Sequence, residues 1–69
     1  MKCILSKPRI ASELAEQGLS IQELADRANM SRQQVYNILS KGSCRPATAG
    51  KLAHGIGVKV SEILKEEQE

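Results

Sequence analysis

Residues 19–39 read LSIQELADRANMSRQQVYNIL, and this stretch decides the fold. Ser20, followed three residues later by Glu23, forms a capping box, which is typical of the start of a helix. Asn29 interrupts the helical pattern, and asparagine tolerates the left-handed backbone that a tight turn requires. Ser31 is placed to cap a further helix. The stretch therefore predicts two short helices joined by a turn, over residues 21–28 and 32–40.

The second of these helices has an apolar side and a polar side of unusual composition. Val35, Ile38 and Leu39 share one side at helical spacing. The opposite side carries an arginine and three amide side chains: Arg32, Gln33, Gln34 and Asn37. In the major groove, arginine makes paired hydrogen bonds to guanine, and glutamine or asparagine to adenine. An ordinary polar surface helix is the alternative interpretation, although such a face more often carries lysine and glutamate.

The composition fits one small helical domain over residues 1–69. There is no Trp or Phe, and Tyr36 is the single aromatic residue, so Leu, Ile, Val and Ala must build the core. The net charge of +2 is unevenly distributed. Residues 1–59 hold nine Lys/Arg and four Asp/Glu (+5), whereas residues 60–69 hold one Lys and four Glu (−3). The basic part is suited to face phosphate, and a charged surface needed for solubility is the alternative.

The sequence offers no signal for a metal, a membrane span or catalysis. Cys3, Cys44 and His54 are too few for a structural zinc site, which takes four ligands. No secretory leader is recognisable, and no apolar run approaches the roughly 20 residues that span a bilayer. We expect both thiols to be reduced in a cytoplasmic protein that has no cofactor. One His and a short chain argue against an enzyme.

The rest of the chain predicts three more helices. Pro8 suits a first helical turn and Gly18 a left-handed helix end. Residues 40–45 read as a loop with Gly42 as its turn residue. The additional helices are expected over residues 8–17, 46–54 and 61–66, the last of them with Ser61 as its cap and Glu62 in its first turn. Residues 1–6 and 67–69 are expected to be flexible, although the apolar start could also act as a staple or add a strand to a partner.

The chain resembles the Cro/CI-like, or XRE-type, helix-turn-helix regulators of phages and bacteria. The similarity covers about residues 9–64 in an ordered set with the right gaps. The matching residues are Gly18-Leu19-Ser20, Glu23-Leu24-Ala25, Met30-Ser31-Arg32, Val35, Ile38, Gly42, Arg45-Pro46, Leu52-Ala53, Gly57-Val58 and Ile63-Leu64. The resemblance implies an all-α, lambda-repressor-like bundle of four or five short helices whose third helix reads the major groove.

The resemblance also implies which side chains contact DNA. The positions that this family uses for base edges correspond to Arg32, Gln33, Gln34 and Asn37. The expected phosphate contacts lie at helix starts, on the third helix and in the loop after it: Ser20, Ser31, Tyr36, Lys41, Ser43 and Arg45. Phosphate contacts position a protein without reading sequence. Tyr36 has a second interpretation, in which its ring covers the edge of the core.

Two departures from the family pattern are informative. Ile21 stands where the family often has a DNA-contacting glutamine, so specificity should depend more on the helix over residues 32–40. Leu14 and Leu39 stand where many relatives carry an interior Arg–Glu pair. Replacing both partners of a buried pair by packed apolar groups is often neutral or stabilising, whereas removing one costs about 3–5 kcal/mol. We therefore predict that Leu14 and Leu39 are in contact.

The sequence-level prediction of function is a sequence-specific double-stranded DNA-binding regulator, a repressor in the usual case. We expect a weak homodimer that forms fully on a pseudo-palindromic operator, with half-sites about 10–10.5 base pairs apart. Its surface could come from Val58, Val60, Ile63 and Leu64, although some of these residues must close the core. An antitoxin-type protein-interaction module on the same fold is one alternative. A structural or adaptor protein that no longer binds DNA is another.

Overall fold

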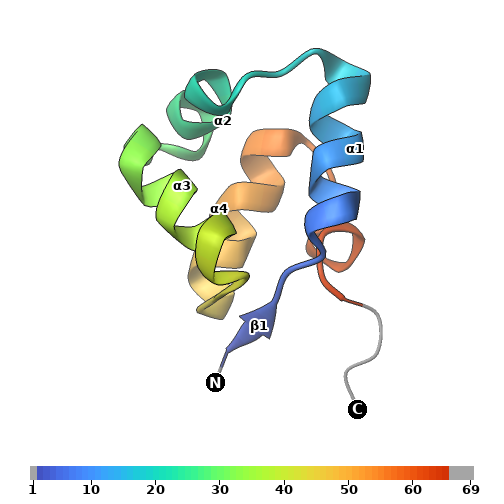
Figure 1. The fold of residues 1–69 in the computed structure, drawn as a ribbon, viewed down its shortest axis with the longest axis vertical. Helices are drawn as coiled ribbons and strands as arrows, with labels where there is room; N and C mark the ends of the chain where they lie inside the picture. Colours follow the sequence, from blue (N-terminus) through green and yellow to red (C-terminus); the bar gives the residue numbers. More distant parts are fainter. Residues whose placement is uncertain (1, 66–69) are drawn as a thin grey trace.

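The computed structural model describes residues 2–65, with α4 in the middle, flanked by α1 on one side and by α2 and α3 on the other (Figure 1). In chain order the elements are β1 (Cys3–Ile4), α1 (Lys7–Gln17), α2 (Ile21–Ala28), α3 (Arg32–Lys41), β2 (Ser43–Cys44), α4 (Pro46–Ile56) and the 3-10 turn η1 (Val60–Glu62). Four α-helices dominate, so the predicted all-α bundle is confirmed.

The α-helices begin and end within two residues of the predicted positions because local sequence signals fix their ends. The Ser6 hydroxyl oxygen accepts a hydrogen bond from the Arg9 amide (3.4 Å) at the start of α1. Gly18 ends α1 at φ 63°, and Asn29 ends α2 at φ 60°. Among residues 2–65, Asn29 is the only non-glycine residue with positive φ. This is the residue type that tolerates such a turn best after glycine.

Helix α4 continues two residues past its predicted end because Gly55 lies inside it rather than ending it. A Cβ added to Gly55 would lie 3.1 Å from the Cβ of Ala28, 3.1 Å from the Ala28 backbone nitrogen and 3.1 Å from Cδ1 of Leu24. Helices α2 and α4 therefore lie so close together that a side chain at this position would require its neighbours to shift by a few tenths of an ångström. The helix ends at Ile56, and Gly57 caps it at φ 91°.

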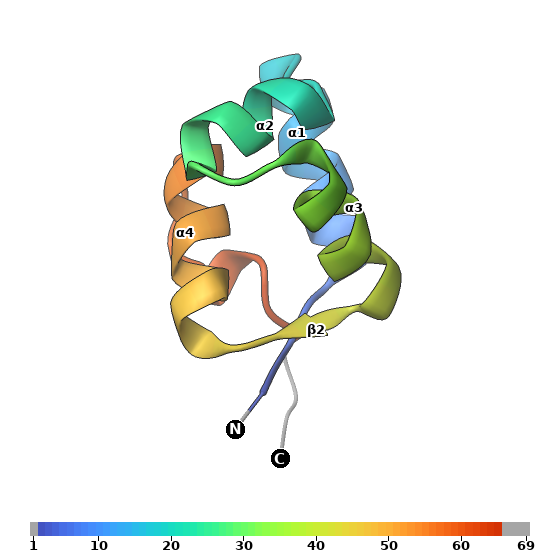
Figure 2. The same cartoon turned by 90° about the vertical axis from the view of Figure 1, so that its left-hand side faces the viewer.

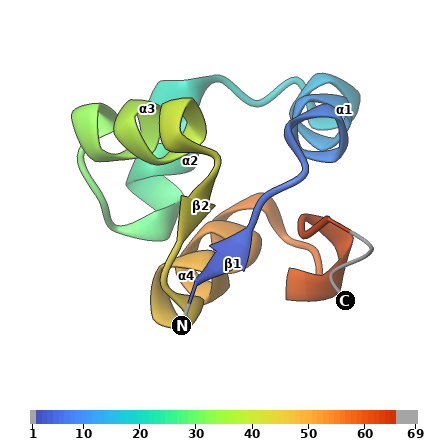
Figure 3. The same cartoon turned by 60° about the horizontal axis from the view of Figure 1, so that its bottom comes forward.

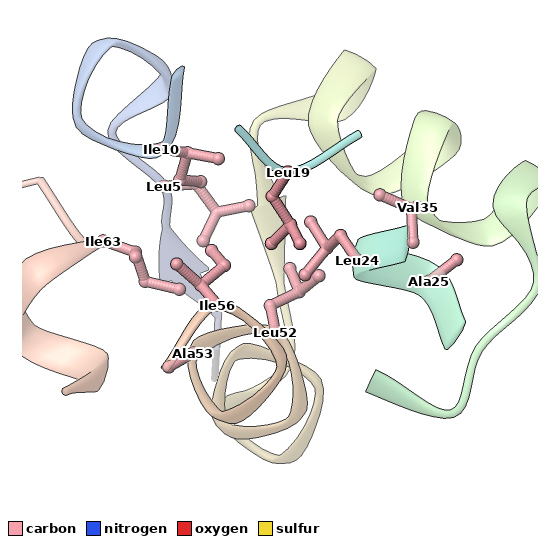
Figure 4. Close-up of a cluster of buried hydrophobic side chains, with 10 residues drawn as sticks. All are labelled: Leu5, Ile10, Leu19, Leu24, Ala25, Val35, Leu52, Ala53, Ile56 and Ile63. Atoms are coloured by element: carbon pink, nitrogen blue, oxygen red, sulfur yellow. The ribbon is translucent and has the colours of Figure 1, made fainter. Parts of the chain in front are cut away.

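The core contains only aliphatic side chains, which converge from every helix (Figure 4). Its buried members are Leu5, Ile10, Leu19, Leu24, Ala25, Val35, Leu52, Ala53, Ile56 and Ile63. No polar or charged side chain among residues 2–65 is buried. Tyr36 is 51% exposed, so its ring is not part of this core, and the interpretation in which the ring covers the edge of the core stays a prediction. Leu14 and Leu39 are both half-buried against this cluster, and their direct contact stays a prediction.

The prediction of a flexible segment over residues 1–6 is wrong for the residues that the structure describes. Strand β1 pairs antiparallel with β2, with Cys3 opposite Cys44. The Leu5 amide extends this pairing by donating to the Gly42 carbonyl oxygen (2.9 Å). Figure 2 shows β2 running from α3 to α4, and Figure 3 shows β1 beside it. The N-terminal residues therefore form a strand within their own fold.

The predicted helix over residues 61–66 is also wrong. Of the described residues 61–65, only Ser61 and Glu62 belong to a helical element, the 3-10 turn η1, and Leu64 forms an isolated antiparallel bridge with Leu5. Two hydrogen bonds join the segments, from the Ser6 amide to the Ile63 carbonyl oxygen (2.8 Å) and from the Lys65 amide to the Ile4 carbonyl oxygen (2.9 Å). These bonds satisfy backbone groups that a helix would pair internally. Residues 66–69 lie outside the described residues.

The two glycines inside α4 should respond oppositely to substitution by alanine. Gly50→Ala adds a methyl group with no neighbour within 4 Å, so the gain in helix propensity should stabilise the protein by up to about 1 kcal/mol. Gly55→Ala drives the methyl group against the backbone of α2, and overpacking of this kind costs about 1–3 kcal/mol. Urea unfolding of both variants measures the difference. A Gly55→Ala protein as stable as Gly50→Ala would contradict the close approach of α2 and α4.

The predicted contact between Leu14 and Leu39 can be measured by a double-mutant cycle. Leu39→Glu alone should destabilise the fold by about 2 kcal/mol, less than for full burial because the site is half-exposed. Leu14→Arg alone should also destabilise it. The double variant should recover at least about 1 kcal/mol of the combined loss if the two positions touch. Strictly additive free energies of unfolding would show that they do not.

Candidate nucleic-acid interface

Helices α2 and α3 begin with the same reciprocal cap. At α2 the Ser20 hydroxyl oxygen accepts from the Glu23 amide (3.1 Å), and the Glu23 carboxylate accepts from the Ser20 amide (2.9 Å). At α3 the Ser31 hydroxyl oxygen accepts from the Gln34 amide (3.1 Å), and Gln34 Oε1 accepts from the Ser31 amide (2.9 Å). Each cap pairs two backbone amides that the first turn of a helix leaves unpaired. The starts of both helices are therefore held in a defined direction.

Gln34 is partly committed to this cap. A paired contact with adenine needs one acceptor and one donor from the same amide group. The Gln34 carboxamide oxygen already accepts from the Ser31 amide, so a paired contact with adenine would use the second lone pair of that oxygen together with the Nε2 group. The signal was present in the sequence, because glutamine three residues after serine completes a capping box as well as glutamate does.

Gln33 and Asn37 form one unit on the exposed side of α3. The Gln33 Nε2 group donates to Asn37 Oδ1 at 3.1 Å, across one helical turn. This bond leaves Gln33 Oε1 as an acceptor and Asn37 Nδ2 as a donor. Arg32 is exposed nearby and makes no hydrogen bond or ion pair with any described residue. The surface therefore presents both acceptor and donor groups to a ligand, as recognition of base edges requires.

The orientation of α3 is set from its opposite side. Val35 is fully buried, and Ile38 and Leu39 are half-buried against the same core. The preceding turn is held by the Met30 amide, which donates to the Ala25 carbonyl oxygen (2.9 Å). The predicted base-reading residues consequently lie on the exposed part of α3.

A concave pocket of about 460 Å³ lies beside α3, between the α2–α3 turn, β2 and the start of α4. Three of its lining residues are cationic, namely Lys41, Arg45 and Lys51, and none is acidic. Arg45 is the N-cap residue of α4 and forms no side-chain cap there. Unpaired amides at a helix start favour anions, and lysine and arginine add positive charge. The pocket is therefore suited to a phosphate group.

Sequence analysis missed the two residues of α4 that line this pocket, Thr48 and Lys51. A signal was available, because Arg45, Thr48 and Lys51 recur at intervals of three residues. Residues at this spacing are neighbours on one helix surface. With Arg45 assigned to phosphate, the two following positions on the same surface were candidates as well.

The predicted phosphate-contacting residues fall into two groups. Lys41, Ser43 and Arg45 come together at the pocket. Ser20 and Ser31 stand at the exposed starts of α2 and α3, where their hydroxyl oxygens accept cap bonds while each O–H group remains a donor. The remaining candidate, the Tyr36 hydroxyl, belongs to an exposed side chain on α3.

The described residues show neither a metal cluster nor a membrane span. No group of three or more His, Cys, Asp or Glu side chains within residues 2–65 is arranged to hold a metal ion. No helix in this part of the chain is long and apolar enough to cross a membrane.

Comparison with known proteins gives one match. A protein-family model described as helix-turn-helix matches residues 10–63. This range includes α1 from Ile10 onward and the whole of α2, α3 and α4. No curated protein and no solved structure matches the chain.

The cap at α2 should be visible in the titration of Glu23. Its pKa lies below the ordinary value of 4.5, chiefly because the carboxylate accepts the Ser20 backbone hydrogen bond, and further because of the Ser20 side chain. A carboxyl group with a lowered pKa stabilises the fold above its unfolded-state pKa. This contribution is lost as the pH falls through the folded-state pKa.

NMR titration of the Glu23 carboxyl group should therefore give a midpoint below 4.5. Ser20→Ala should raise the midpoint part of the way towards that value, because the reciprocal bond is lost. Ser31→Ala removes the equivalent serine from α3 and serves as the control with an unchanged midpoint. A midpoint at or above 4.5 in the unsubstituted protein would show that the cap does not form in solution.

Proposed function

The chain belongs to the Cro/CI-like (XRE-type) helix-turn-helix family, and from this premise we propose that it represses transcription by placing α3 in the major groove of an operator. Family membership supports a DNA-binding helix-turn-helix regulator. The observation that carries the finer proposal is the exposed surface of α3, on which Arg32 lies near the hydrogen-bonded Gln33 and Asn37. These groups have no part in the core, which leaves them available to a ligand.

In this proposal, four side chains of α3 read bases. Arg32 donates to guanine O6 and N7, the most frequent specific contact in the major groove. Gln33 and Asn37 offer the acceptor and donor left over from their mutual hydrogen bond, a pattern that suits adenine. Gln34 is less free to contact a base, because its oxygen would have to be shared between the base and the cap of α3. Specificity therefore depends most on residues 32, 33 and 37.

The phosphate contacts hold α3 in register. The proposed set is Ser20, Ser31, Tyr36, Lys41, Ser43 and Arg45, to which the pocket adds Thr48 and Lys51. Lys41, Arg45 and Lys51 supply the charge that releases counterions from DNA, so affinity should fall steeply with salt. Contacts of this kind set position and orientation and carry no base preference.

The proposed dimer is weak and forms fully only on DNA. Ile63 is completely buried and Leu64 bridges to Leu5, so Ile63 cannot belong to the dimer surface suggested by the sequence. Val58 and Val60 are half-buried. Ile4 and Tyr36 are the only large apolar side chains exposed among residues 2–65. Stable homodimers bury more apolar surface than this, which supports association driven by two half-sites on one operator.

The structure weighs against the antitoxin-type alternative in one respect. Strand β1 pairs with β2 on one side and with the segment around Leu64 on the other. Both of its edges are therefore partly paired within its own fold, which leaves less backbone to add to a partner's sheet. We accordingly favour a non-enzymatic regulator that acts on DNA in the cytoplasm.

Selection from a random DNA library, followed by binding titrations, tests base reading. The unsubstituted protein should enrich a two-fold symmetric site, and Arg32→Ala/Gln33→Ala should bind that site about 100-fold more weakly or worse, because each base contact is worth about 1–3 kcal/mol. Gln17→Ala/Arg27→Ala removes the same side-chain types outside α3 and should keep most of the affinity. Salt-sensitive binding without an enriched site would contradict sequence reading.

The same titrations separate base contacts from phosphate contacts. Lys41→Ala/Arg45→Ala should weaken binding to all sequences alike and reduce the slope of log affinity against log salt by about two for each bound subunit. The α3 double variant loses one arginine, so its slope should change by one at most. An unchanged slope in the Lys41→Ala/Arg45→Ala variant would show that the pocket does not contact phosphate.

A further inference from the structure

The two cysteines of the chain lie directly opposite each other. Cys3 in β1 and Cys44 in β2 are partners in the strand register, and residues paired in this way project from the same side of a sheet. Leu5, two residues after Cys3, is buried, whereas the intervening Ile4 is 42% exposed. Because side chains alternate along a strand, both thiols lie on the core-facing side of the ribbon, where each is half-buried.

The spacing of the strands brings the thiols within bonding reach. The Leu5 amide donates to the Gly42 carbonyl oxygen, and alternation along the ladder then makes Cys3 and Cys44 a hydrogen-bonded pair. Such pairs have Cα atoms about 5.5 Å apart, inside the range of roughly 4.4–6.8 Å that a disulfide spans. Their Cβ atoms, about 4.5–5.5 Å apart, need to approach by only on the order of 1 Å.

We propose that Cys3 and Cys44 are a redox modification site that forms a reversible intramolecular disulfide and fastens β1 to β2. The oxidant is a low-molecular-weight disulfide such as glutathione disulfide. One cysteine thiolate attacks it, a protein–glutathione disulfide forms, and one glutathione thiolate leaves. The second cysteine, after losing its proton, attacks the protein sulfur and releases the other glutathione. The two protein thiols lose two electrons, and glutathione disulfide gains them.

The surroundings of Cys44 make this a slow reaction at neutral pH. Cys44 lines the pocket beside α3, so a small oxidant can reach it from solvent. Burial, together with the neighbouring Cys3, raises the pKa of the Cys44 thiol above its ordinary value of 9.0. Because the thiolate is the reactive form, the rate of disulfide formation should rise about tenfold for each unit of increase in pH, as long as the pH stays below that pKa. A reduced resting state that oxidises under stress fits the transient, redox-sensing disulfides of reducing compartments.

The disulfide would also act on the DNA-binding surface, an effect that rests on the proposed function. Strand β2 lies between Lys41 and Arg45, both of which line the cationic pocket. Fastening β2 to β1 restricts this segment before DNA arrives. Preorganisation reduces the ordering cost of binding, so the oxidised form should bind DNA severalfold more tightly than the reduced form.

The first test needs no DNA. The full chain is equilibrated in glutathione buffers of increasing oxidised fraction, quenched with an alkylating agent and weighed by intact mass spectrometry. We expect an unalkylated monomer lighter by two hydrogens, with a melting temperature higher by roughly 10 °C. The Cys3→Ser and Cys44→Ser variants should instead stop at the glutathione adduct. Two alkylated thiols in every buffer, a stable glutathione adduct on the unsubstituted protein, or a disulfide-linked dimer would overturn the proposal.

The second test measures DNA affinity of the oxidised and reduced forms by fluorescence anisotropy. Cys3→Ser/Cys44→Ser is the control, and its affinity should not respond to the buffer. Equal affinities of the oxidised and reduced forms would overturn the coupling between the disulfide and DNA binding. If neither form binds any DNA, the proposed function is wrong, while the mass and melting measurements still decide whether the disulfide forms.

Discussion

The close approach of α2 and α4 at Ala28 and Gly55 is the contact on which the rest of the structure depends. A core without Phe or Trp must be filled by small aliphatic side chains, and these leave no gap only when the helices lie close together. Gly55 permits that distance, since any side chain there would meet the backbone of α2. Helix α3 follows α2 through the turn at Asn29 and is anchored by the buried Val35. The direction in which the exposed side of α3 faces is thus set by the α2–α4 contact.

The N-terminal strand supplies a second constraint of a different kind. Local signals fix the ends of the helices. They do not join the end of α3, the start of α4 and the chain after η1 to one another. Residues 4–6 do this through backbone hydrogen bonds, to Gly42 on one side and to Ile63 and Lys65 on the other. The buried Leu5 side chain adds these residues to the core. The strand therefore positions the segment that carries the proposed phosphate contacts.

What could be predicted from the sequence follows the same division. Ser20 with Glu23, Gly18 and Asn29 act within a few residues of themselves, and the structure confirms each of these signals. The β1–β2 pairing joins residues some forty positions apart through strands of two residues, too short to show an alternating pattern. The final helix was predicted because Ser61 and Glu62 suit a helix start. Tertiary pairing of Leu64 with Leu5 overrides that local preference. The cap formed by Gln34 was missed although the sequence signals it, and the contact of Gln34 with a base stays a prediction.

The arrangement separates the residues proposed to read DNA from the residues that maintain the fold, but only in part. Arg32, Gln33 and Asn37 make no contact with the core, and substitutions at such surface positions usually change stability by less than about 0.5 kcal/mol. If these residues read bases as proposed, the preferred DNA sequence can therefore change with little effect on folding. Residues 41–45 have no such freedom, because they end α3, pair with β1, cap α4 and line the cationic pocket at once. A substitution among these residues should alter both the proposed phosphate contacts and the stability of the fold. The proposed base specificity is therefore the more readily altered property of this surface.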